Sequence, residues 1–142
     1  WGRASGTQFV YRNASSVSIS QGTQGFDSSS SSYSDTSPAF KVFENSIGEG
    51  PNQGSCDEVA IWDSVLTSSN ITDIYNSGVA SDLSSLSPEI WWRMGDGTGD
   101  TDSGGGAPAN GDTIGTIVNQ GSAGSSDATG TNGPTFSNSV PE

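Results

Sequence analysis

Apolar residues in this chain fall in short runs that are typical of β-strands, with one exception. The clearest run is VAIW, in which Val59 and Ile61 share one face of an extended strand while Ala60 and Trp62 share the other. Because both faces are apolar, the run predicts a strand buried on both sides. Similar short runs stand at residues 9–11, 17–19, 39–43, 89–94 and 113–118. The pattern predicts an all-β fold.

The exception is a stretch with helical spacing that follows the VAIW run. Thr67 or Ser68 can cap its start, and the sequence Asn-Ser-Gly after Tyr75 supplies a stop in which Gly78 adopts a left-handed conformation. The sequence therefore predicts one short helix over residues 68–76. Its buried stripe would consist of Ile71, Ile74 and Tyr75.

The chain divides into two parts by composition. Residues 1–37 hold two short strand-like runs and a serine-rich loop, and they predict either an amino-terminal arm laid on a neighbour or paired edge strands. Residues 38–142 hold the remaining strands and the helix, together with long glycine-rich loops and a linker over residues 79–88. We expect the second part to form the main β domain.

Charge narrows the choice of partners. Only 4 Lys and Arg residues stand against 16 Asp and Glu, which gives a net charge of −12. Such a chain is repelled by a phosphate backbone and by anionic lipids, so nucleic acid is not an expected partner. No apolar run approaches the ~20 residues of a membrane span, so membrane insertion is not expected.

The chain contains no histidine and a single cysteine, Cys56. Ser-His triads, an intrachain disulfide and a cysteine-based metal site are therefore excluded. Oxygen ligands remain, and calcium is the candidate cofactor. Asp96, Asp100 and Asp102 lie in the glycine-rich loop GDGTGDTD, where a hard cation could gather several oxygens. The alternative is that this acidic loop is solvated.

Paired carboxylates could indicate a glycosidase. A retaining enzyme needs its two carboxylates ~5 to 5.5 Å apart. Glu58 and Asp63 would face opposite sides of an extended strand, whereas Asp57 and Asp63 share a face but lie ~20 Å apart at ~3.3 Å per residue. We therefore expect no glycosidase activity and no enzyme.

Three segments resemble a known family. The stretches DEVAIWDSVLTSSNITDIYNSG, WWRMGDG and NQGSAG resemble the carboxy-terminal part of laminin-G-like, concanavalin A-type modules of phage and marine virus structural proteins, over residues 46–142. The resemblance implies a jelly-roll sandwich, and it allows Glu58 or Asp57 to contribute a calcium ligand. The alternative is that these two acids end a turn and accept hydrogen bonds from backbone groups or from Arg and Lys side chains. The strands that precede this part in the family are not evident in residues 1–45, which favours completion by assembly.

Two adjacent tryptophans, Trp91 and Trp92, are the candidate glycan contacts. We expect one core and one rim residue rather than a platform for sugar rings. The alternative is glycan contact, because an exposed tryptophan beside polar loops is what sugar rings stack against.

The function expected from these features is a non-enzymatic structural or adhesive module on a virion surface, such as a decoration, fibre or appendage subunit. Its partners would be further copies of the chain, other virion proteins and host-surface glycans. The alternative is a calcium-dependent glycan-binding domain of an extracellular bacterial adhesin. Both place the chain on a virion surface or in the extracellular space.

Overall fold

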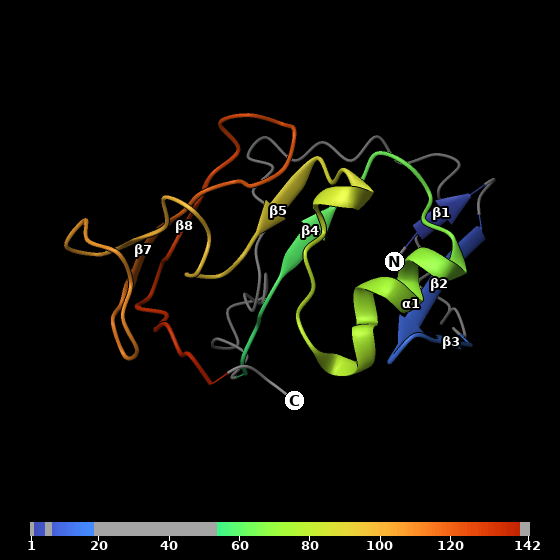
Figure 1. Ribbon diagram of the computed structural model, residues 1–142, viewed down its shortest axis with the longest axis horizontal. Coiled ribbons are helices and arrows are strands. Elements are labelled where there is room, and N and C mark those ends of the chain that lie inside the picture. The colour runs from blue at the N-terminus through green and yellow to red at the C-terminus, as the bar shows by residue number, and fades with distance from the viewer. Residues whose placement is uncertain (1, 5–6, 19–53, 140–142) are drawn as a thin grey trace, which may run out of the picture.

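The computed structural model describes residues 2–4, 7–18 and 54–139 of the chain (Figure 1). In these residues, antiparallel sheets and one α-helix agree with the expected all-β class. The expected strand at residues 39–43 and the serine-rich loop lie outside them. The first sheet holds β1 (Gly2–Ala4), β2 (Thr7–Arg12) and β3 (Ser15–Val17); the second holds β4 (Val59–Ile61) and β5 (Ile90–Trp92); the third holds β6 (Thr101–Asp102), β7 (Ile114–Ile117) and β8 (Ala128–Thr129).

The two strands β4 and β5 form a central ribbon with two different faces. Val59 lies opposite Trp92 and Ala60 lies opposite Trp91 in the antiparallel register. Since side chains alternate along a strand, Val59 and Trp92 share one face while Ala60 and Trp91 share the other. The residues of β4 are only half-buried, so the prediction that this strand is buried on both sides was wrong.

The main core lies between the central ribbon and the β6–β7–β8 sheet. Trp92, Ile114 and Ile117 are buried there, and Phe136 packs against them. Gly95 allows this close packing, because an added Cβ would lie 2.4 Å from the Phe136 ring and 2.9 Å from Ile114. Figure 1 shows β7 and β8 on one side of the ribbon and α1 (Ser68–Tyr75) on the other.

Helix α1 begins and ends as its sequence predicts. The Thr67 hydroxyl accepts a hydrogen bond from the Asn70 backbone N–H, and the Asn70 side chain accepts one from the Thr67 backbone N–H. This reciprocal pair is a capping box with Asn in place of the usual Glu. At the other end Asn76 and Gly78, within the 3₁₀ turn η1 (Asn76–Gly78), have left-handed φ angles of 39° and 87°. No α1 residue is buried, so the expected stripe is at most half-covered.

The segment between α1 and β5, which the sequence suggests is a linker, is part of the packed structure. Leu83 is only 3% exposed, and the 3₁₀ turn η2 (Ser84–Leu86) follows it. The Trp62 indole N–H donates to the Leu86 carbonyl at 2.9 Å. This contact fixes the segment over the face of β4 that carries Ala60.

The first sheet is a meander of paired strands. Asn13 and Ala14 form the two-residue turn between β2 and β3, both with positive φ, which is the geometry of a tight hairpin. Among the described residues β1, β2 and β3 pair only with one another. The amino-terminal runs are therefore paired strands, and the expected boundary near residue 37 lies outside the described ranges.

Candidate functional site

Glu58 lies directly before β4, at the end of the central ribbon where β5 leads into Arg93. Its carboxylate accepts a hydrogen bond from the Trp91 indole N–H through Oε2, and its Oε1 lies 3.2 Å from the Arg93 Nε. Arg93 also pairs with Asp96 at 3.2 Å, and its guanidinium carbon lies 5.4 Å from the centroid of the Trp91 ring. One carboxylate thus links the end of β4 to two residues at the end of β5.

The backbone at this junction is unusual. Glu58 has φ of 46° and Met94 has φ of 56°, both in the left-handed region that non-glycine residues seldom adopt. Both residues lie just beyond the paired ends of β4 and β5. Non-glycine residues in the left-handed region carry conformational strain and are often found at functional sites. Glu58 is therefore a candidate functional residue.

Burial changes the titration of Glu58. Its side chain is 13% exposed, and this burial raises its pKa; the hydrogen bond from Trp91 and the charge of Arg93 partly oppose the rise. The nearby charges of Asp57 and Asp96 raise the pKa further. Asp63 is exposed and is not among these neighbours.

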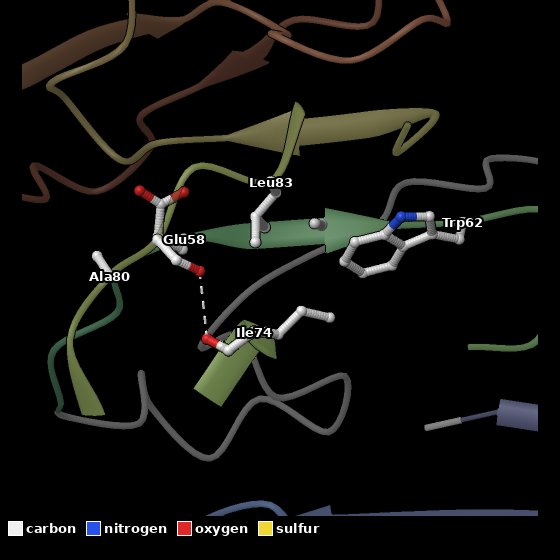
Figure 2. Close-up of a pocket in the computed structure, with 7 residues that line it drawn as sticks. Glu58, Trp62, Ile74, Ala80 and Leu83 are labelled. Atoms are coloured by element: carbon white, nitrogen blue, oxygen red, sulfur yellow. Dashed lines mark hydrogen bonds between the residues drawn. The ribbon is translucent and has the colours of Figure 1, made fainter. Parts of the chain in front are cut away.

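A pocket of about 210 Å³ lies between the central ribbon and α1. Figure 2 shows Trp62 at one end, Glu58 and Ala80 at the other, and Ile74 facing Leu83 across the space. The Glu58 carboxylate points away from Ile74, in keeping with its contacts to Trp91 of β5 and to Arg93 just after it. The pocket is lined by Glu58, Ala60, Trp62, Ile74, Ala80, Ser81 and Leu83. It is an apolar space with an acidic residue at one end.

A second, more polar pocket of about 290 Å³ has residues 55–57, Arg93, Met94, Asp96 and residues 135–139 in its wall. Cys56 is half-buried there, and burial together with the charge of Asp57 raises the pKa of its thiol. A thiol with a raised pKa holds its proton at neutral pH and is a poor nucleophile. The pocket therefore supplies no activated cysteine.

Asp100 is buried, at 5% exposure, and its carboxylate organises its own loop. Oδ2 accepts hydrogen bonds from the backbone N–H groups of Gly95 and Gly97, both at 3.0 Å, and Oδ1 accepts one from Val118 at 2.7 Å. The carboxylate thus joins the loop after β5 to the end of β7. Three backbone partners account for both oxygens of this predicted calcium ligand.

The other acidic residues of this loop have different partners. Asp102 Oδ1 accepts from the backbone N–H groups of Gly104 and Gly106, at 2.7 and 3.0 Å, which closes the glycine-rich turn. Asp96 is exposed and pairs with Arg93. Across the described ranges no three Asp, Glu or Cys side chains are grouped so that they could hold a metal ion. The calcium site stays a prediction. In the structure, Asp100 and Asp102 accept hydrogen bonds from backbone N–H groups, and Asp96 forms an ion pair with Arg93.

Both tryptophans of the predicted glycan contact are buried. Trp91 is 5% exposed and Trp92 is 7% exposed, and the Trp92 indole N–H donates to the Ser126 carbonyl at 2.9 Å. They lie on opposite faces of the central ribbon. The expectation that one of them lies at the rim was wrong, and neither ring has the open face that stacking on a sugar requires.

Two residues that the sequence analysis did not single out hold the centre of the molecule together. Arg93 is the partner of both Glu58 and Asp96. Asn119, at 9% exposure, accepts hydrogen bonds from the backbone N–H groups of Trp91 and Gly121, at 2.8 and 2.9 Å. Arg93 could have been predicted as an ion-pair partner, because it stands in the sequence between two tryptophans and an acidic loop. No local sequence feature distinguishes Asn119.

Comparison with known proteins gives no relative: no family model matches the chain, and no curated protein or solved structure is significantly similar to it. In the part of the chain that the structure describes, no helix has the length and apolar character needed to cross a membrane.

Proposed function

We propose that this chain is a non-enzymatic structural or adhesive module, displayed on a virion surface or in the extracellular space, that works by assembling with other protein subunits. The observation that carries the proposal is the use of its carboxylates. Asp100 and Asp102 bind backbone N–H groups, and Glu58 binds Trp91 and Arg93. Acidic residues that could have served catalysis or metal binding are thus structural acceptors.

The finer description rests on the sequence resemblance. We propose a jelly-roll sandwich that is completed by assembly, with a virion as its setting, because the segments that contain Glu58, Trp91 and Asn119 resemble viral laminin-G-like modules. The small antiparallel sheets around one short helix are compatible with this arrangement. Host-surface glycans remain candidate partners through loops other than the buried tryptophans.

Light scattering of the purified chain, first with calcium and then with excess chelator, tests the proposal. An assembling structural module should give a mass above that of one chain, and chelator should not change it. A monomer at all concentrations would refute the assembly part of the proposal.

The same samples distinguish the alternative. A calcium-dependent glycan-binding domain should bind an immobilised glycan panel in calcium and release it in chelator. That result would favour the alternative function, a calcium-dependent glycan-binding domain of an extracellular adhesin, over the structural proposal.

A further inference from the structure

The charges of this chain are divided unevenly along the sequence. Residues 1–26 contain Arg3 and Arg12 and no Asp or Glu, while all 16 acidic residues lie after them with only Lys41 and Arg93. In the described structure, the two arginines belong to β1 and β2 of the first sheet. The molecule therefore has a basic amino-terminal sheet and an acidic remainder.

One face of this sheet combines positive charge with exposed apolar surface. Val10 lies opposite Val17 in the register of β2 and β3, and Arg12 is two residues from Val10, so the three share a face. Arg12 is exposed, and Val17 is 38% exposed. We call Val10, Arg12 and Val17 the basic face.

The pocket beside α1 has the opposite character. Its interior is mainly apolar, and its volume of about 210 Å³ exceeds the ~150 Å³ that accommodates a benzene molecule, so a branched aliphatic side chain fits. Three exposed aspartates adjoin lining residues in the sequence: Asp63 follows Trp62, Asp73 precedes Ile74, and Asp82 lies between Ser81 and Leu83. Hydrogen bonds from Ser84 lower the pKa of Asp82, which favours its charged form.

From this complementarity we infer that the basic face of one copy docks on the pocket beside α1 of a second copy. An aliphatic side chain of the face, Val17 or Val10, enters the apolar pocket, and Arg12 pairs with one of the exposed aspartates that adjoin the lining residues in the sequence. The inference rests on the proposed assembly function and specifies its contact. Because the two surfaces differ, the contact is head-to-tail and generates a ring or a filament.

Two variants of the full chain damage one surface each. Arg12→Glu reverses the charge of the basic face. Asp73→Lys combined with Ala80→Phe reverses the charge of an exposed aspartate next to the lining residue Ile74 and fills the pocket from an exposed lining residue. Light scattering over a concentration series should show each variant at the mass of one chain under conditions in which the unchanged protein assembles, with the contact weakened at least about tenfold.

Mixing the two variants is the decisive step. Each keeps the surface that the other lacks, so an equimolar mixture should form a dimer that contains one chain of each. Arg12→Lys keeps the positive charge and should assemble normally. Ser125→Lys with Thr129→Lys, both exposed and on or near β8, adds the same charge as Asp73→Lys and should also leave the mass unchanged. Circular dichroism confirms that each variant is folded.

Other results overturn the inference. If both variants assemble like the unchanged protein, or if the mixture stays monomeric, the contact is elsewhere or is not head-to-tail, and the proposed assembly function stands without it. If the unchanged protein is itself a monomer, the inference and the assembly proposal fail together. A monomer in which the basic face covers the pocket of its own chain belongs to this second case.

Discussion

Asp100 shows how single residues stabilise this chain. Its buried carboxylate accepts hydrogen bonds from three backbone N–H groups, which would otherwise lie in the protein without an acceptor. The glycine-rich sequence around it has little side-chain surface to bury, so these polar contacts define the loop. Among the described acidic residues, Asp100, Asp102 and Glu58 act in this way as acceptors within the structure.

Replacing Asp100 with Ala should lower the free energy of unfolding by about 3 kcal/mol, since it leaves the N–H groups of Gly95, Gly97 and Val118 without their acceptor. Asp100→Asn, which keeps one carbonyl oxygen, should lower it less. Denaturant titration measures both. Asp96→Asn, at an exposed ion pair, is the control and should cost less than about 1 kcal/mol. An Asp100→Ala variant as stable as Asp96→Asn would refute the structural role.

The raised pKa of Glu58 should be detectable in the pH dependence of the free energy of unfolding. Because its pKa is raised in the folded protein, mainly by burial, the folded state holds this proton more tightly than the unfolded state does. Its ionisation therefore disfavours folding above the raised pKa, and the penalty disappears as the pH falls toward the ordinary range of a glutamate pKa. Glu58→Gln should gain stability relative to the unchanged protein at pH 7 and lose that gain near pH 4.

Unfolding titrations of both proteins between pH 4 and pH 7 test this difference. Asp63→Asn, at an exposed position, controls for the loss of one acidic charge. A stability difference between Glu58→Gln and the unchanged protein that is constant over this range would show that the folded protein does not shift the Glu58 pKa.

At the scale of elements, the sequence was a good guide where the signals are local. The capped start and left-handed end of α1 depend on residues within a few positions, and both were predicted. Strand β4 ends one residue before its apolar run does, at Trp62, whose indole N–H donates to the Leu86 carbonyl. Leu83 was assigned to a linker because its burial depends on the distant ribbon that it covers.

The cap of α1 provides a prediction of known size. Thr67→Ala removes the hydroxyl that accepts from the Asn70 N–H at 3.2 Å and should lower the free energy of unfolding by about 1 kcal/mol. Thr67→Ser keeps the acceptor and should be nearly neutral. Chemical denaturation of the two variants beside the unchanged protein checks this, and equal stability for Ala and Ser would indicate that the helix start is frayed in solution.

At the scale of the whole molecule, sequence patterns could not show which distant residues meet. The pocket combines one face of β4 with Ile74 of α1 and residues 80–83, and only tertiary packing brings these together. The tryptophans were predicted as a pair with one exposed member, yet alternation along β5 places each in a separate buried layer. The uneven division of charge is visible in the sequence. The docking contact that we infer from it also requires the apolar pocket beside α1, which only tertiary packing forms.

In the loop after β5, the carboxylates of Asp100 and Asp102 accept backbone hydrogen bonds, and we predict that these bonds hold the loop without a metal ion. The most direct test is the free energy of unfolding in excess calcium and in excess chelator, at matched ionic strength and with magnesium as the control for charge screening. We expect a difference below about 0.5 kcal/mol, because these carboxylates already have backbone partners and would give calcium little preference for the folded state. Stabilisation by about 2.7 kcal/mol in calcium and not in magnesium, as expected for a ligand at 100 times its dissociation constant, would contradict it.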